Sequence, residues 1–122
     1  MMVEIKRTFS SFSVTDTAKA KEFYSNLGVK VNVDGPGLRM ELQNGGTVFV
    51  YPKPNHEPAT FTILNFVVED IDQAVDQLKS RGIAFERYEG MSQDEKGIMR
   101  AEGPPIAWFK DPSGNILSVI KA

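Results

Sequence analysis

The sequence predicts an α+β fold in which two tandem βαβββ modules form an eight-stranded, curved, partly open mixed sheet with the helices outside. Three observations predict it: a gapless internal repeat, a capped helix in each copy, and short alternating strands separated by glycine turns. At 122 residues the chain is long enough for one domain. We expect that domain to consist of a first module at residues 1–54 and a second at 60–122.

The repeat relates residues 9–29 to residues 63–83, 54 positions further on, without a gap. Its aligned pairs include Phe12 with Phe66, Val14 with Val68, Asp16 with Asp70 and Gly28 with Gly82. In each copy the Phe and Val predict one buried face of a strand, the Asp predicts the start of a helix, and the Gly predicts its end. Each copy therefore predicts a strand followed by a helix.

Each helix is followed by three further predicted strands, at residues 30–33, 38–42 and 47–52 in the first copy and 84–88, 106–109 and 115–120 in the second. The run GTVFVY (46–51) matches GNILSV (114–119), 68 positions further on, which aligns Val50 with Ser118. The charged, glycine-rich connection at 89–105 predicts either a mobile lid or a short extra strand.

One helix per module covers only one face of its strands, so the other face must be covered or must bind something. Strand alternation places on that face Phe9, Ser11, Ser13, Ile63, Asn65, Val67, Ile116, Ser118 and Ile120. The hydrogen-bonding groups of this set are hydroxyls and one amide. We therefore expect a hollow that is half apolar and half neutral and polar.

Composition excludes several classes of function. The net charge is −2 and the basic residues are scattered, which argues against nucleic acid or an anionic membrane as the partner. Cysteine is absent, which excludes disulfides, thiolate nucleophiles and Cys-ligated metals. There is no apolar run long enough to span a bilayer. These properties predict a cytoplasmic protein.

Two further patterns carry a resemblance to a known family: Val14-Thr15-Asp16…Phe23-Tyr24…Leu27-Gly28, and the closing run WFKDPSGN at 108–115. They resemble the vicinal oxygen chelate superfamily, the group of glyoxalase I, bleomycin-resistance proteins, fosfomycin-resistance enzymes and extradiol dioxygenases. The resemblance covers about residues 9–121. It implies the paired βαβββ fold and a homodimer.

Catalytic members of that superfamily hold a divalent metal, through His, Glu or Gln on the first strand of each half and a carboxylate near the end of each half. The matching positions here are Phe9, Ile63, Val50 and Ser118. Three apolar side chains and one hydroxyl do not form a cage for a divalent cation. We therefore expect no metal and no cofactor.

These observations predict a metal-free small-molecule-binding protein of the glyoxalase/bleomycin-resistance type, which sequesters an organic ligand in the cavity of the curved sheet. Antibiotic binding is one possibility. The expected ligand contacts are Phe9, Ser11, Val50, Ile63, Asn65, Trp108 and Ser118, with no catalytic residue. Trp108 either stacks on a flat ligand or packs in the core. The alternatives are a metal-dependent lyase, isomerase or dioxygenase with an atypical site, and a regulatory or structural domain whose cavity is filled by its own side chains.

Five polar residues outside that set leave other chemistry open. His56, the single histidine, lies in a proline-rich connection, where a solvated side chain is favoured over a general base or metal ligand. Glu41 and Glu102 could act as metal-free bases, and Arg39 and Arg100 could hold an anion. For all four the expected position is the surface.

Overall fold

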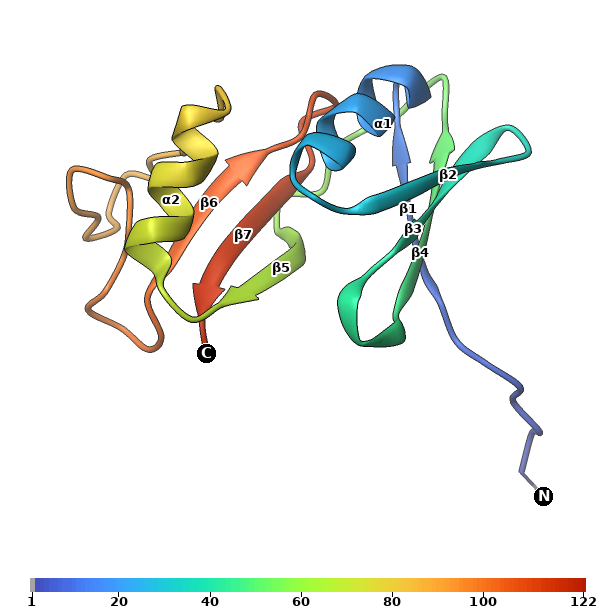
Figure 1. The fold of residues 1–122 in the computed structure, drawn as a ribbon, viewed down its shortest axis with the longest axis horizontal. Coiled ribbons are helices and arrows are strands. Elements are labelled where there is room, and N and C mark those ends of the chain that lie inside the picture. The colour runs from blue at the N-terminus through green and yellow to red at the C-terminus, as the bar shows by residue number, and fades with distance from the viewer. Residues whose placement is uncertain (1) are drawn as a thin grey trace. The chain divides into compact units, whose positions relative to one another are not determined.

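The computed structural model describes residues 2–122, with position 44 described by its backbone alone. Seven β-strands and two α-helices are present in this part of the chain (Figure 1). They are distributed over two compact units, Met1–His56 and Glu57–Ala122. The α+β class predicted from the sequence is confirmed.

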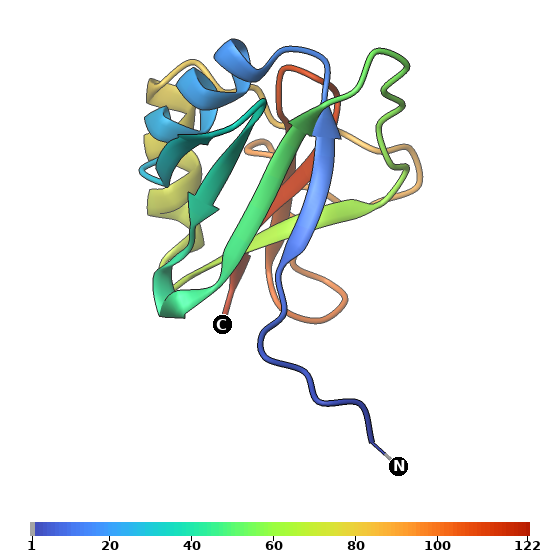
Figure 2. The ribbon, with the colours of Figure 1, turned by 90° about the vertical axis from the view of Figure 1, so that its right-hand side faces the viewer.

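The first unit contains β1 (Ser10–Val14), α1 (Thr17–Asn26), β2 (Lys30–Asp34), β3 (Gly37–Glu41), a single 3-10 turn (Gln43–Gly45) and β4 (Thr47–Pro52). Its four strands are ordered β1-β4-β3-β2. The first strand pairs parallel with the last, and the other neighbours are antiparallel. Figure 2 shows β1, in blue, directly beside β4, in green.

The second unit contains β5 (Thr62–Val68), α2 (Ile71–Ser80), β6 (Ile106–Lys110) and β7 (Ile116–Lys121). Its three strands are ordered β5-β7-β6, again with the first strand parallel to the last. The two units therefore repeat the same pairing scheme, as the internal repeat implies.

The predicted strand at 84–88 does not form, so the expected number of eight strands is wrong. The segment touches β6 at one bridge, between Phe85 and Phe109, and through a 2.8 Å hydrogen bond from the Glu86 N–H to the Trp108 carbonyl. Beyond that point the edge of β6 is occupied, because Ile106 exchanges both of its backbone hydrogen bonds with Met99. A regular ladder cannot continue past a strand edge whose groups are already paired.

The two helices begin and end where the repeat predicts. Asp16 accepts a 3.0 Å hydrogen bond from the Lys19 N–H, and Asp70 accepts an equivalent bond at the start of α2. Caps of this kind stabilise a helix by about 1 kcal/mol. Gly28 and Gly82 follow the helices with φ of 96° and 88°, a conformation that favours glycine. At ten residues each, neither described helix is long and apolar enough to cross a membrane.

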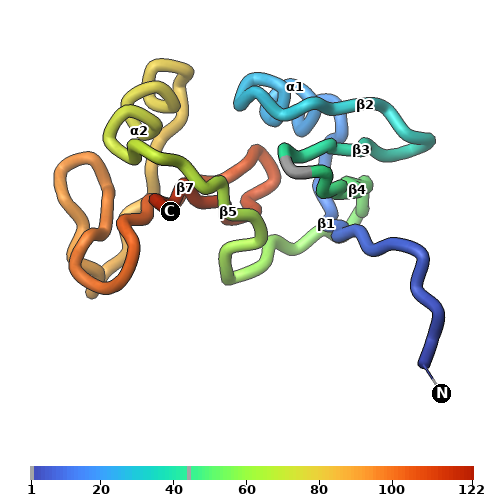
Figure 3. Tube along the Cα trace, turned by 60° about the horizontal axis from the view of Figure 1, so that its bottom comes forward, coloured from blue at the N-terminus to red at the C-terminus, as the bar shows by residue number. Residues whose placement is uncertain are grey.

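Each helix covers one face of the strands of its own unit (Figure 3). In the first unit α1 lies against β2, β3 and β4, and the Tyr24 ring contacts Phe12 with 5.9 Å between centroids. In the second unit α2 lies against β7. The buried apolar side chains of the two units include Val14, Ala20, Tyr24, Leu38, Met40, Val48, Val50, Ile71, Val75, Ala107, Phe109, Leu117 and Val119.

Candidate ligand-binding faces of the two sheets

The second unit has a helix-free face defined by strand register. Trp108 on β6 pairs with Ser118 on β7, and Ser118 pairs with Asn65 on β5. Register partners point to the same side of a sheet, so these three predicted site residues share one face. The same face carries Val67, Ile106, Lys110, Ile116 and Ile120. Their role as ligand contacts stays a prediction.

Trp108 extends across this face. Its indole Nε1–H donates a 3.1 Å hydrogen bond to the Thr62 hydroxyl on β5, although β7 lies between β6 and β5. The indole must therefore span β7. Its neighbour Phe109 points to the other side, where it is fully buried and meets the Phe85 ring edge-on at 5.6 Å. Of the two aromatic residues, Trp108 is the one available to the helix-free face.

The buried serine beside the indole has a neutral partner. Ser118 is 0% exposed, and its hydroxyl donates a hydrogen bond to Asn65 Oδ1 at 2.5 Å. This bond explains how a serine can lie within an apolar strand, because buried polar groups are normally hydrogen-bonded. The centre of the helix-free face therefore carries an uncharged hydroxyl–amide pair.

The position of Ile63 differs from simple alternation. The register of β5 shifts between Thr62 and Leu64, which makes Ile63 the extra residue of a bulge. Thr62, rather than Ile63, pairs with Ile116 and carries the hydroxyl that receives the Trp108 bond. Thr62 was not predicted as a site residue, because a bulge interrupts the two-residue period without changing residue type.

A second aromatic ring stands beside the indole. Tyr88 meets Trp108 edge-on, with 5.5 Å between ring centroids and 80° between ring planes. The Tyr88 hydroxyl oxygen is buried and has no hydrogen-bond partner in the described residues. Burial, and secondly the charge of Glu86, raise the pKa of Tyr88. Nothing in the sequence marks Tyr88 beyond its place in a predicted strand.

One glutamine side chain organises the backbone around Tyr88. Gln93 accepts a 2.8 Å hydrogen bond from the Tyr88 N–H, and donates to the carbonyls of Glu86 at 3.0 Å and Gly97 at 2.8 Å. A side-chain amide thus replaces the missing strand ladder. This role of Gln93 was not predicted from the sequence.

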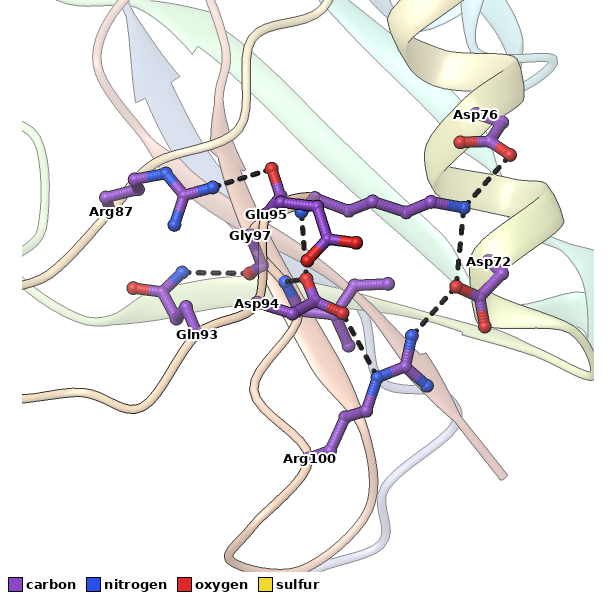
Figure 4. A network of polar contacts seen from close by, with 10 residues as sticks. Asp72, Asp76, Arg87, Gln93, Asp94, Glu95, Gly97 and Arg100 are labelled. Carbon is purple, nitrogen blue, oxygen red and sulfur yellow. Dashed lines mark hydrogen bonds and ion pairs between the residues drawn. The ribbon is translucent and has the colours of Figure 1, made fainter.

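The 89–105 connection is anchored to the second unit at several points. Ile98 is 1% exposed, and isolated bridges join Met99 to Gln93 and to Ile106. Figure 4 shows a set of ion pairs between the connection and α2. Lys96 lies 3.4 Å from Asp72 and 3.1 Å from Asp76, and Arg100 lies 2.8 Å from Asp72 and 3.2 Å from Asp94. The connection was expected to form either a short extra strand or a mobile lid. It forms only isolated β-bridges and no strand. Its closure as a lid stays a prediction.

The first unit has its own helix-free face. Ser11 pairs with Phe49 and Ser13 pairs with Tyr51, so these four residues share it. The rings of Phe49 and Tyr51 are stacked, with 6.2 Å between centroids and 15° between planes. Ser11 is exposed on this face, as its predicted role requires.

Val50 lies on the opposite, helix-covered side, so its predicted place among the ligand-facing residues is wrong. It pairs with Phe12 and Leu38 and is 0% exposed. The error arises because the alignment of Val50 with Ser118 is shifted by one residue. Ser11 and Asn65 are equivalent in the repeat, and they pair with Phe49 and Ser118, so Phe49 is the true counterpart of Ser118.

Phe9 precedes the first strand of the first unit, and His56 follows its last strand. Phe9 precedes β1, is 51% exposed, and carries the Arg7 guanidinium 5.3 Å above its ring. His56 is half-buried, with Nδ1 2.6 Å from the Ser13 hydroxyl oxygen. The expectation of a solvated linker histidine is therefore wrong, because His56 folds back onto the helix-free side of β1.

The charged candidates lie at the surface, as expected. Glu41 pairs with Lys30 at 3.3 Å, and Arg39 pairs with Asp34 at 3.6 Å. Arg100 belongs to the ion pairs of Figure 4, and Glu102 is exposed in a bend. Arg39 and Glu41 pair with Phe49 and Thr47, so they lie on the helix-free face of the first unit.

The donor set does not fit the superfamily's divalent metal. Of the four matching positions only Ser118 carries a polar side chain, and its hydroxyl is bonded to Asn65. Moving the alignment by one residue at Val50 brings in Phe49, which supplies no donor. Across the described residues, no group of three or more His, Cys, Asp or Glu side chains is placed to hold a metal ion. We therefore derive no step that uses a metal.

Comparison with known families agrees with the resemblance in the sequence. The family model described as the Glyoxalase/Bleomycin resistance protein/Dioxygenase superfamily matches residues 8–119. The chain belongs to this superfamily. No match was found among curated proteins.

Similar solved structures show the same fold. A hypothetical protein, SA1046 from S. aureus, is 22% identical with a TM-score of 0.71, and the match covers 97% of this chain and 98% of that one. The fosfomycin resistance protein FosX from Listeria monocytogenes is 12% identical with a TM-score of 0.71, covering 100% and 95%. TnmS3, an antibiotic binding protein from Streptomyces sp. CB03234, is 22% identical with a TM-score of 0.68, covering 97% and 98%.

Proposed function

We propose that this chain is a non-catalytic binding protein that sequesters a flat organic molecule on the helix-free face of its second unit. The observation that carries the proposal is the indole of Trp108, held across β7 by its hydrogen bond to Thr62. A fixed aromatic surface offers a large contact area at little cost in side-chain entropy. The exposed Asn65 amide, to which the buried Ser118 hydroxyl is bonded, suits an uncharged polar group of the ligand.

Two properties of the face favour binding over chemistry. Its central polar groups are a hydroxyl and an amide, which neither titrate near neutral pH nor hold a divalent cation. Its one ion pair, between Lys110 and Glu86 at 3.7 Å, is a partly exposed salt bridge. A general base with a matched acid partner is missing from the face as described.

The similar structures support this choice of class. TnmS3 is described as an antibiotic binding protein and FosX as a fosfomycin resistance protein. We accordingly propose antibiotic-like aromatic molecules as the first ligands to test. The competing function, a metal-dependent enzyme, is tested by metal analysis after dialysis and by titration with Ni²⁺, Zn²⁺, Mn²⁺ and Fe²⁺. Binding of one metal ion per chain, together with measurable turnover, would refute the proposed binding function and support a metal-dependent enzyme.

The binding proposal is tested with Trp108, which is the only tryptophan of the chain. Neutral aromatic molecules of two or three fused rings should quench its fluorescence saturably. The Trp108→Ala variant should weaken binding about tenfold or more in calorimetry, since it removes the aromatic surface. Trp108→Phe keeps a ring without the indole N–H and should bind with intermediate affinity.

A control separates loss of the site from loss of the fold. Phe61→Ala removes an aromatic ring that is 67% exposed just before β5, and should bind as the wild type does. Circular dichroism should show the same fold in all variants. An affinity that is unchanged in Trp108→Ala, or no quenching across the panel, would refute binding at this face.

A further inference from the structure

We propose that the Tyr88 hydroxyl is a specificity-determining hydrogen-bond donor, and that the ligand carries a neutral acceptor oxygen, such as a ketone carbonyl, at the edge of its aromatic rings. This inference rests on the proposed function, because it concerns the same face. The observation behind it is a buried hydroxyl oxygen that has no partner in the described residues.

Tyr88 belongs to the helix-free face although it lies outside the regular strands. The Glu86 N–H donates to the Trp108 carbonyl, which places Glu86 opposite Trp108. Tyr88 follows two residues later, and alternation returns it to the same side. Its ring meets the indole edge-on at 5.5 Å. A molecule stacked on the indole therefore lies next to the tyrosine.

The missing partner is an energetic reason to expect a ligand group. Folding removes water from the hydroxyl, and a buried group without a replacement bond keeps the full desolvation penalty. Native proteins hold few such groups, and those that persist often have a functional reason. A ligand oxygen would supply the bond once it displaces the atoms that cover the hydroxyl in the free protein.

The hydroxyl is also held in place before a ligand arrives. Gln93 fixes the backbone on both sides of it, by accepting from the Tyr88 N–H and donating to the Glu86 carbonyl. The contact with Trp108 limits the orientations of the Tyr88 ring itself. A donor fixed in advance loses little entropy on binding, which raises its contribution to specificity.

The chemistry of the partner follows from the local charges. The raised pKa of Tyr88 keeps its hydroxyl protonated at neutral pH, so it can donate. The nearby Glu86 carboxylate disfavours a second anion beside the tyrosine. Lys110, the ion-pair partner of Glu86, already has that carboxylate 3.7 Å away. A neutral carbonyl fits these groups better than a carboxylate does.

The test uses two probes of the same size and shape. 2-Acetonaphthone carries a carbonyl on a naphthalene ring, and 2-isopropenylnaphthalene replaces that carbonyl oxygen by a methylene group on the same planar carbon. The preference for the ketone is the ratio of their two Kd values. In Tyr88→Phe this ratio should fall by about 2- to 10-fold, as expected for the loss of one hydrogen bond.

The control variant is Tyr24→Phe, which removes a hydroxyl from the buried side of α1 in the first unit and should keep the wild-type ratio. An unchanged ratio in Tyr88→Phe, with both probes bound, would overturn this inference and leave the proposed function standing. Failure of the wild-type protein to bind either probe would overturn both.

A second measurement needs no ligand. Tyr88→Phe removes an unsatisfied group, so its thermal unfolding midpoint should equal or exceed that of the wild type. A midpoint lower by several degrees would show that the hydroxyl already has a partner in the free protein. That result would overturn the inference whatever the probes show.

Discussion

Ser118 is one of the four positions at which this chain differs from the metal-ligand set that the family resemblance implies. The resemblance places a metal-binding carboxylate at this position, and the chain has a hydroxyl there that is bonded to Asn65. A carboxylate buried in the same place would need a cation or a strong donor to offset its desolvation. A serine is stabilised by a single neutral acceptor. A hydroxyl at this position therefore suits uncharged groups better than it suits an ion.

At this scale we predict an asymmetry between the two partners of the pair. Ser118 is buried and Asn65 is exposed, so removing each partner leaves a different group unpaired. Asn65→Ala leaves the buried Ser118 hydroxyl without its acceptor and should lower the free energy of unfolding by about 1–3 kcal/mol. Ser118→Ala leaves an amide that water can reach, and should cost only about 0.5–1.5 kcal/mol apart from any packing loss. Urea unfolding of both variants and of the double variant measures the difference. Equal costs would mean that the Ser118 hydroxyl finds another partner.

At the scale of elements, the edge of β6 shows how side chains can replace a strand. The chain after α2 begins to pair with β6 at Phe85 and then leaves it, because Met99 has taken the next pairing position. The Gln93 amide takes over the backbone groups left unpaired. Irregular backbone is stable only when its polar groups are satisfied in this way. The segment that carries Tyr88 thus depends on one glutamine.

Replacing Gln93 should loosen this segment and leave the rest of the second unit intact. Gln93→Ala removes three side-chain hydrogen bonds, and should lower the free energy of unfolding by about 1–3 kcal/mol. Hydrogen exchange of the Tyr88 amide should accelerate, whereas the amides of β7 should keep their relative protection. Exchange at Tyr88 equal to that of the wild type would show that the segment is held by other contacts.

The ion pairs between α2 and the connection predict an acid-sensitive contribution to stability (Figure 4). The hydrogen bond from Arg100, opposed by some burial, lowers the pKa of Asp72 below its usual 3.8. For Asp94 burial raises the pKa, but hydrogen bonds from the Ile98 N–H and from Arg100 outweigh it, and the net pKa is lowered. A lowered folded-state pKa adds stability above pH 3.8, which is lost as the pH falls through the folded value.

Arg100→Gln should therefore unfold at a lower temperature than the wild type at pH 7. This gap between the two unfolding temperatures should close below about pH 3.8. High salt should narrow the same gap, because these side chains are exposed. Arg39→Gln in the first unit, which breaks one isolated pair with Asp34, is the matched control. A gap that stays constant from pH 7 to pH 2.5 would mean that Arg100 acts through packing.

At the scale of the whole molecule, the repeat made most of the architecture predictable. Capping Asp, closing Gly and the Phe-x-Val strands are local signals, and each reappears in the structure where its copy predicts. The helix-free positions of Asn65 and Ser118 followed from strand alternation, whereas the sequence left Trp108 between a ligand-facing position and the core. These features depend on periods of two and of 3.6 residues, which a sequence displays directly.

The remaining features depend on long-range pairing that no local period displays. The bulge at Ile63 shifted the register and concealed Thr62. The alignment of Val50 with Ser118 was wrong by one residue, and one residue reverses the face of a strand. The pairing of His56 with Ser13 joins positions 43 residues apart. Only the folded chain brings such groups together.

The parallel pairing of first and last strands also sets an order of events during synthesis. The first unit has its complete sheet once the ribosome has released Pro52, the end of β4. In the second unit β7 is the middle strand, so β5 and β6 stay unjoined until residues 116–121 emerge. Trp108 therefore has no strand to lie across until β7 has been translated, and the helix-free face of the second unit forms later than the sheet of the first unit.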